Sequence, residues 1–497
     1  MKFERSAGIL LHPASLPGKY GIGELGHEAF TYIDFLKETG CKLWQVLPLG
    51  PSGYGDSPYQ SFSAFAGNPL LISLEILSQE GLLLTKDLIN DHRFQEDRID
   101  YGAIIPWKLN LLEKAFINFK RLKESLILEF ESFCEEKKFW LNDYALFMSL
   151  KELNRGGSWV NWPDYFKNQK QVKISNSSDD LKFRMEKYKF FQFIFFRQWL
   201  SIKAYANGLG INIIGDIPLY VAHDSADVWS HPDLFQLNDN GNPTVIAGVP
   251  PDYFSSTGQL WGNPIYRWEV HKNTGYKWWM ERIKNQLKLV DIIRLDHFRG
   301  FSGYWEIPAS NLTAEQGRWV QGPGMDFFTS VISNLSAGKD LPFIAEDLGE
   351  ITPDVNDLRK HLNIPGMKIL QFAFSGPENI YLPHHYNHNC VVYTGTHDND
   401  TSLGWFNEAP EKEKVFAKEY LRSGCNNIVW DLIRAGWSSV AVFAIAPMQD
   451  ILTLDSSARM NYPGRMGGNW NWKMGNGLLE KELMEKLKGF NRIYGRD

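Results

Sequence analysis

Short hydrophobic runs recur along the chain, and each has the pattern of a strand that is buried on both faces. A half-exposed strand alternates hydrophobic and polar residues, whereas these runs are almost continuously apolar. Parallel strands covered by helices have this pattern, so the runs predict an α/β fold with a parallel sheet. The runs begin at Ala7, Cys41, Ile211, Val290, Pro342, Met367, Asn389 and Ser439.

Helical patterns separate most of these runs, for example at 28–40, 275–290, 352–362 and 411–436. Strands and helices therefore alternate, and eight strand candidates favour a TIM (β/α)8 barrel. The alternative is an open, doubly wound sheet, because a count of units does not show whether the sheet closes.

The runs are unevenly spaced, because the second ends near residue 50 and the third begins at Ile211. The residues between them include a loop rich in Gly, Ser, Pro and Tyr, followed by several helical patterns. We therefore expect a barrel formed by 1–50 and 186–497, with 51–185 as an inserted subdomain on one of its loops.

The composition excludes several classes of protein. With 43% hydrophobic and 22% charged residues, the chain is neither disordered nor fibrous. It has 52 Lys and Arg against 58 Asp and Glu, so it lacks the basic surplus that attracts nucleic acid. The most apolar run, 190–196, is too short to span a membrane. The N-terminal residues lack a signal-peptide pattern and the four cysteines are widely separated, so we expect a cytoplasmic protein.

Aromatic residues are unusually frequent, at 18 Trp, 20 Tyr and 32 Phe. Phenylalanine concentrates in helical patterns such as 190–196, where a role in the core is expected. Tryptophan and tyrosine gather in loop-like segments, where flat rings could line a long cleft. These segments are 53–62, 156–166, 252–266 and 461–472.

Acidic residues follow four of the predicted strands: Asp216, Asp296, the pair Glu346 and Asp347, and Asp398. In a barrel the carboxyl ends of the strands converge on one mouth, so these acids are expected to share a pocket. The alternative is that each acid caps the helix that follows it.

The surroundings of two of these acids suggest different chemistry. Arg294 lies two residues before Asp296, on the same side of a strand, and would keep that carboxylate ionised, as a nucleophile requires. Glu346 follows an apolar stretch that would raise its pKa, as a proton donor requires. Periodicity does not decide whether Glu346 or Asp347 faces the mouth.

Two other kinds of site were considered and are disfavoured. Histidines near the acids (His12, His223, His297 and His397) lack metal-ligand spacing such as HxH or HExxH, so we expect no metal. The spacing of Gly21, Gly23 and Gly26 matches a dinucleotide-binding fingerprint, but such a turn must follow its strand directly. Prolines separate these glycines from the preceding strand. We therefore expect no cofactor.

Three motifs carry a resemblance to a known family. RLDHFRGF at 294–301, IAEDLG at 344–349 and GTHDND at 395–400 resemble, in this order, the conserved regions of the α-amylase clan. The sequences of these motifs are similar to those of amylomaltases, which are also called disproportionating enzymes or 4-α-glucanotransferases. Further matches extend the resemblance over essentially the whole chain, at 10–26, 44–69, 215–229, 248–266, 459–464 and 469–472. The chain ends soon after the eighth strand, so the β-sandwich of many amylases is not expected.

The resemblance implies Asp296 as nucleophile, Glu346 as general acid/base and Asp398 as the acid that holds sugar hydroxyls and stabilises the transition state. It thereby selects Glu346 over Asp347. The substrate-binding residues that it implies are Ser57, Tyr59, Asp216, Tyr253, Phe254, Gln259, Trp261, Arg294, His297 and His397. Tyr59 would carry the donor sugar on its ring.

Two further features are expected from the resemblance. The segment at about 248–266, with Tyr253, Phe254 and Trp261, would close as a lid over the acceptor side, unless its rings only pack the loop down. Tyr54 and Tyr101 would form a secondary glucan site, unless they are ordinary structural tyrosines.

The function implied is transfer of α-1,4-glucan segments by a retaining double displacement, with the two carboxyl groups about 5 to 5.5 Å apart. The expected partners are maltooligosaccharides, starch or glycogen chains as donors, and glucan or glucose as acceptor. Two alternatives remain open: an α-glucan hydrolase with the same acids, and a non-catalytic glucan-binding protein. The latter is disfavoured, because binding alone needs no nucleophile.

Overall fold

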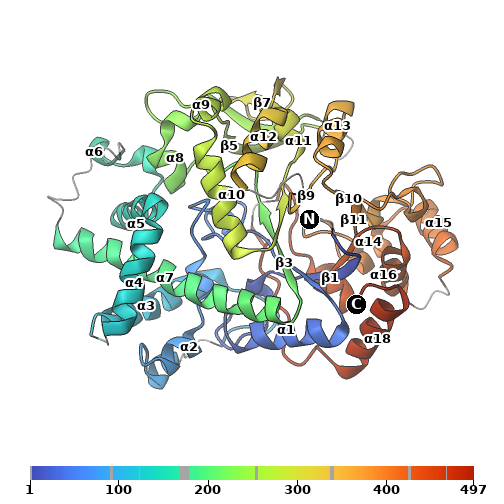
Figure 1. Ribbon diagram of the computed structural model, residues 1–497, viewed down its shortest axis with the longest axis horizontal. Helices are drawn as coiled ribbons and strands as arrows, with labels where there is room; N and C mark the ends of the chain where they lie inside the picture. Colours follow the sequence, from blue (N-terminus) through green and yellow to red (C-terminus); the bar gives the residue numbers. More distant parts are fainter. Residues whose placement is uncertain are drawn as a thin grey trace.

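The computed structural model describes residues 3–89, 93–121, 124–167, 169, 178–251, 256–335, 341–423, 427–465 and 467–497. A closed barrel of parallel strands lies at the centre, with helices outside it (Figure 1). Around the barrel the order is β1 (Ser6–Leu10), β12 (Phe443–Pro447), β11 (Cys390–Tyr393), β10 (Gly366–Ile369), β9 (Phe343–Ala345), β6 (Ile292–Leu295), β3 (Asn212–Ile217) and β2 (Leu43–Gln45). Because β1 pairs with both β2 and β12, the predicted barrel is confirmed and the open sheet is excluded.

Each of the eight predicted hydrophobic runs contains one strand of the barrel. In these strands every residue is buried except Asn212 and Lys368, because side chains fill the barrel on one face and the helices cover the other. Most of the strands end before the run does. The residues that follow the strands lie at the mouth of the barrel.

Most of the outer helices follow the amphipathic patterns of the sequence. The predicted helix at 411–436 is two helices, because Arg422 has a φ of 54° and ends the first of them. The outer helices are α1 (His27–Thr39), α10 (Lys277–Leu289), α12 (Gly324–Leu335), α13 (Pro353–His361), α14 (Ser402–Glu408), α15 (Glu411–Leu421), α16 (Ile428–Ser438) and α18 (Lys481–Ile493). Short helices α8 (Ala226–Ser230), α9 (Trp268–Asn273), α11 (Arg299–Ser302) and α17 (Met448–Ile451) lie in the connections.

A helical region occupies most of the chain between β2 and β3. It comprises α2 (Leu74–Gln79), α3 (Tyr101–Phe119), α4 (Glu124–Glu136), α5 (Lys138–Leu153), α6 (Asp164–Lys167) and α7 (Asp179–Gly208). Phenylalanines of α7 pack against those of α3 and α4, as the predicted core role of this residue requires. The boundary expected at 185 falls inside α7, a single helix that also contacts α10 through the indole of Trp199 on the carbonyl of Leu289.

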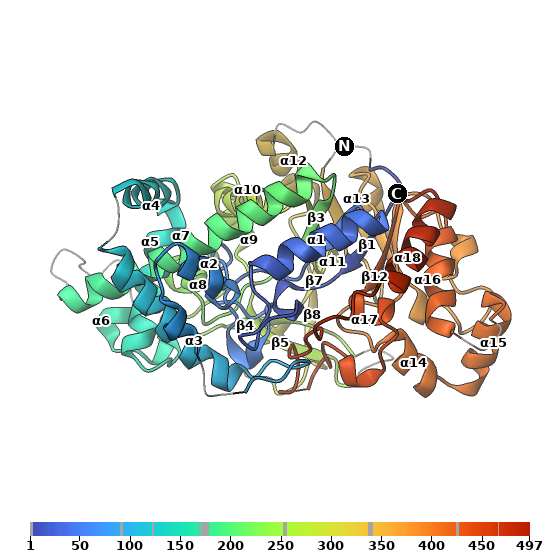
Figure 2. The ribbon, with the colours of Figure 1, turned by 90° about the horizontal axis from the view of Figure 1, so that it is seen from below.

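A second, antiparallel sheet was not predicted. Its order is β5 (Gln259–Pro264), β4 (Val245–Val249), β7 (Gly303–Pro308) and β8 (Arg318–Gln321). The segment 248–266, expected to be a loop, therefore contains β5 and the end of β4. Glycine and proline within these strands, and an irregular register between Ile246 and Gly248, hide the strand pattern. Figure 2 shows β4 and β5 toward the end of the molecule opposite the chain termini.

Two arginines close the end of the barrel at which the strands begin. Arg496 is fully buried and donates hydrogen bonds to the carbonyls of Ser6, Trp437 and Ala441, among others. Arg5 donates to Trp437 and Ala441 from the other side. The carbonyls of Trp437 and Ala441 lie at and beyond the C-terminus of α16, where a helix favours positive charge, and that of Ser6 lies at the start of β1.

Replacing Arg496 by alanine is expected to lower the free energy of unfolding by about 2 to 5 kcal/mol, because several buried carbonyls lose one of their donors and a buried side chain is removed. Denaturant unfolding followed by circular dichroism measures the change. Arg492→Ala is the matched control, since Arg492 is an exposed residue of α18. Equal stability of the two variants would contradict the role given to Arg496.

Candidate active site

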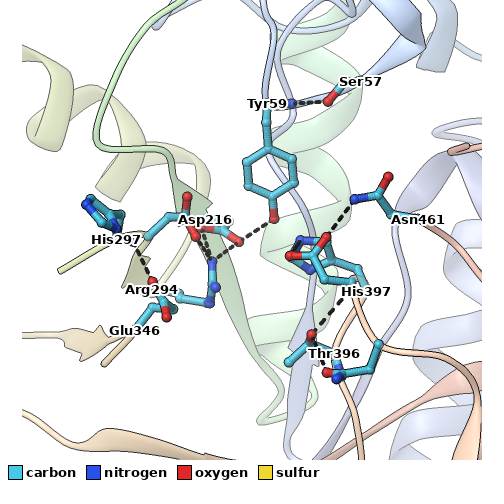
Figure 3. A network of polar contacts seen from close by, with 12 residues as sticks. Ser57, Tyr59, Asp216, Arg294, His297, Glu346, Thr396, His397 and Asn461 are labelled. Atoms are coloured by element: carbon cyan, nitrogen blue, oxygen red, sulfur yellow. Dashed lines mark hydrogen bonds and ion pairs between the residues drawn. The ribbon is translucent and has the colours of Figure 1, made fainter. Parts of the chain in front are cut away.

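The strand register brings the predicted acids together at the mouth. Asp216 pairs with Arg294 between β3 and β6, and Leu295 pairs with Ala345 between β6 and β9. The residues that follow Leu295 and Ala345, Asp296 and Glu346, therefore lie side by side where the strands end. Figure 3 shows the side chains of Asp216, Arg294 and Glu346 facing a common space.

Arg294 links two of the acids. Its Nη1 donates to Asp216 Oδ2 at 2.7 Å and to Asp296 Oδ1 at 2.9 Å. Burial opposes the charge of this arginine, but the carboxylates around it raise its pKa well above the ordinary value. The Asp216 side chain is 0% exposed and the Asp296 side chain is 28% exposed. Asp296 is thus the carboxylate of this pair that a ligand in the mouth can reach.

Glu346 is held by backbone amides. The N–H of His297 donates to Oε2 at 2.8 Å, and the N–H of Leu348 donates to Oε1 at 2.9 Å. Burial and the negative charge of Asp296 raise the pKa of Glu346 to about 7, against the opposing effects of Arg294 and the two amides. A carboxyl group with this pKa exchanges its proton near neutral pH, as a general acid/base does.

Asp347 faces away from the other acids. Its carboxylate lies 3.1 Å from Nε of Arg359 in α13 and accepts the N–H of Met367 at 2.7 Å. Asp347 therefore anchors β10 and α13, and this geometry agrees with the choice of Glu346 that the resemblance implied.

Asp398 reaches the mouth from the loop after β11. Asn461 Nδ2 donates to Asp398 Oδ1 at 2.6 Å, and His397 Nε2 lies 3.3 Å from Asp398 Oδ2. Arg459 donates to the backbone carbonyl of Asp398 at 2.8 Å. Because the Asp398 side chain is 48% exposed, its carboxylate is open to a ligand while its backbone is fixed.

Tyr59 lies against the same group of residues. Its hydroxyl donates to Asp216 Oδ2 at 2.9 Å, and its backbone N–H donates to Ser57 Oγ at 3.2 Å. Its ring is stacked on His397, with centroids 5.0 Å apart and planes at 19°. Burial and the charge of Asp216 raise the pKa of Tyr59 well above its ordinary value, so the hydroxyl stays protonated.

The antiparallel sheet contributes aromatic and amide groups. Trp261 on β5 contacts His297 edge to face, with centroids 4.8 Å apart, and its Nε1 donates to Gln259 Oε1 at 3.2 Å. Burial lowers the pKa of His297 to about 4, so this ring is neutral. Tyr253 and Phe254, expected in the same segment, lie outside the described residues.

The two tyrosines predicted for a secondary glucan site differ in exposure. Tyr54 is 77% exposed on a short turn, as a surface contact would require. Tyr101 is half-buried at the start of α3, and its hydroxyl donates to the carbonyl of Trp470 at 3.1 Å. The secondary glucan site stays a prediction.

The expectation that tryptophans of the aromatic segments line a cleft is wrong for two segments. Trp159 and Trp162 in 156–166, and Trp470 and Trp472 in 461–472, are buried. The indoles of Trp159 and Trp162 donate to the carbonyls of His223 and Gly157 and thereby fix the loop. The composition located these segments but did not show which way their side chains point.

Two site residues were missed, although they lie in a matched segment. Asn461 and Arg459 belong to the RMNYPG stretch, which was noted for its resemblance but given no role. Only the fold of the chain after β12 brings them to Asp398. Among the described residues, no group of three or more His, Cys, Asp or Glu side chains is placed to hold a metal ion. None of the described helices has the length and apolar composition of a membrane span.

Comparison with known proteins decides the family. The family model described as 4-alpha-glucanotransferase matches residues 11–478. The chain belongs to the 4-alpha-glucanotransferase family. The resemblance found in the sequence is therefore confirmed, and the protein is an enzyme that transfers α-glucan segments.

Individual relatives cover the chain from end to end. The 4-alpha-glucanotransferase of Thermus thermophilus is 49% identical over 98% of both chains. That of Synechocystis is 48% identical over 99% of this chain and 98% of its own. The structure is also similar to that of the amylomaltase from Streptococcus agalactiae in complex with acarbose, with a TM-score of 0.95 and 40% identity over 99% of this chain and 100% of that one.

Because Asp296 raises the pKa of Glu346 in this glucanotransferase, Asp296→Asn is expected to lower that pKa from about 7 toward the ordinary value of a glutamate. Infrared or 13C NMR titration of the carboxyl group measures the midpoint. Asp291→Asn is the control, since Asp291 immediately precedes β6, at the end opposite the mouth, and binds the N–H of Ile213. An unchanged midpoint in Asp296→Asn would contradict the role given to the charge of Asp296.

Proposed function

We propose that Asp296, Glu346 and Asp398 perform the transfer by a retaining double displacement. The observation that supports this most strongly is the pairing of an accessible Asp296, hydrogen-bonded to Arg294, with a Glu346 whose pKa is about 7. Retaining enzymes need such a pair: a carboxylate that attacks and a neighbouring acid that protonates the leaving oxygen.

In the first step Glu346 protonates the glycosidic oxygen while Asp296 attacks the anomeric carbon, which forms a covalent glucosyl ester and releases the rest of the donor chain. Esterification neutralises Asp296, so the negative charge that together with burial raised the pKa of Glu346 disappears. The amides of His297 and Leu348 then stabilise the carboxylate of Glu346. Glu346 thus becomes a base at the point where the acceptor hydroxyl must lose its proton.

Asp398, held by Asn461, would bind sugar hydroxyls beside the reacting carbon and stabilise positive charge that develops there. Tyr59 and His397 would support the donor sugar, and Trp261 with Gln259 would extend the binding surface onto β5. The substrates we propose are maltooligosaccharides and starch or glycogen chains, with glucan or glucose as acceptor. We further propose a cytoplasmic location and no cofactor.

Incubation with maltotriose tests the function. Transfer is expected to give glucose together with a ladder of longer oligomers, whereas a hydrolase would only shorten the substrate and a binding protein would leave it unchanged. Asp296→Asn is expected to lower the rate by at least about a thousandfold, because no ester can form. Chromatography of the products measures the reaction, and calorimetry measures the binding of maltotriose. Together they distinguish a loss of catalysis from a loss of binding.

Asp291→Asn again serves as the matched control, because it removes a carboxylate next to the same strand but far from the mouth. It is expected to keep the wild-type rate per folded molecule. Substantial transfer by Asp296→Asn would contradict its assignment as nucleophile.

The pH dependence follows from the same pair. Glu346 is protonated below about pH 7 and loses its proton above it, so kcat/KM for maltotriose should fall with rising pH, tenfold per unit at the limit. A glucosyl fluoride donor needs less protonation of its leaving group and should show a weaker decline. If kcat/KM has the same pH dependence for the two donors, the decline belongs to a group other than Glu346.

A further inference from the structure

Trp470 combines burial with a strained backbone next to the active site. It has a φ of 62° and an exposed fraction of 8%. A non-glycine residue in the left-handed region is strained and persists where its surroundings fix it, commonly at functional sites. The preceding Gly467 and Gly468, at φ of 75° and 76°, lead the chain into this turn.

The indole of Trp470 contacts two rings of the donor side. Its centroid lies 5.7 Å from that of Tyr59 and 5.7 Å from that of His397, and those two rings stack on each other. Tyr59 is bonded to Asp216, and His397 precedes Asp398. Trp470 therefore supports both rings, while its own burial leaves little surface for a sugar.

The backbone of Trp470 is fixed on both sides. Its N–H donates to the carbonyl of Met460 at 2.8 Å, and its carbonyl accepts the Tyr101 hydroxyl at 3.1 Å. The next residue, Asn471, accepts the N–H of Ile99 at 2.8 Å. The start of α3, in the inserted helical region, thus holds the segment that carries Trp470.

We propose that Trp470 is a positioning residue that holds Tyr59 and His397 in the geometry for transfer, and that the Tyr101 hydroxyl acts through it. This inference rests on the catalytic roles proposed above. The proposal gives Tyr101 a role inside the protein, which does not depend on a glucan bound at a secondary site on the surface.

Trp470→Gly tests the role of the ring, because glycine adopts the positive φ without strain while the indole is lost. Loosening Tyr59 and His397 should lower kcat for maltotriose about tenfold to a hundredfold, since small misplacements of catalytic groups have effects of this size. Trp470→Phe keeps a ring in place and should recover most of the rate. Thermal unfolding of each variant separates folding from positioning.

Trp162→Ala is the control for the loss of a buried indole, since Trp162 fixes a loop of the inserted region. It should lower stability and leave kcat per folded molecule unchanged. If Trp470→Gly keeps wild-type kcat while Asp296→Asn is inactive, the inference fails and the proposed function stands. If both variants are fully active, the proposed function fails as well.

Tyr101→Phe removes only the hydroxyl and tests the second half of the proposal. It should lower kcat several-fold for maltotriose, and the effect should vanish in the Trp470→Gly background, because the hydroxyl acts through Trp470. A loss confined to long glucans, or one that adds to that of Trp470→Gly, would instead indicate direct glucan binding and would overturn this half.

Discussion

The active site depends on one guanidinium group. Arg294 holds Asp216 and Asp296, two carboxylates from neighbouring strands that would otherwise repel each other. Two such charges in a partly buried mouth are costly without a cation, because burial disfavours ions that lack a partner. Burial and the negative charge of Asp296 raise the pKa of Glu346, and Arg294, which is bonded to the two aspartates, opposes this only in part. The two proposed catalytic carboxyls thus have different surroundings because Arg294 forms its hydrogen bonds with the aspartates.

The roles of the buried acids in this protein are set by the groups that surround each carboxyl rather than by whether the residue is Asp or Glu. Asp347 adjoins Glu346 in sequence, yet it faces Arg359 and anchors two outer elements. Asp450, also buried, accepts hydrogen bonds from Thr394 and Ser402 and holds the two ends of the loop that carries Asp398. Glu346 is buried beside the carboxylate of Asp296, and burial and this negative charge together raise its pKa against the opposing effect of Arg294.

The barrel could be predicted because its strands are covered on both faces, which leaves continuous hydrophobic runs, and the acids were found because they end those runs. The choice between Glu346 and Asp347 could not be made by period, since both lie beyond the last paired residue, Ala345. The antiparallel sheet could not be predicted from the sequence, because glycine and proline interrupt its strands. No role was predicted for Asn461 and Trp470, because these residues reach the mouth only where the chain folds back after β12.

The two ends of the barrel use buried arginines for different purposes. Arg496 is bound by carbonyls, whose charge is fixed, so it holds the chain at one end and responds to no chemical step. Arg294 is bound by carboxylates, one of which, Asp296, loses its charge in the proposed mechanism when it forms an ester. The loss of that charge alters the proton affinity of Glu346 at the moment when an acid must become a base. A cation between two carboxylates therefore couples the two halves of the proposed transfer, which a cation among carbonyls could not do.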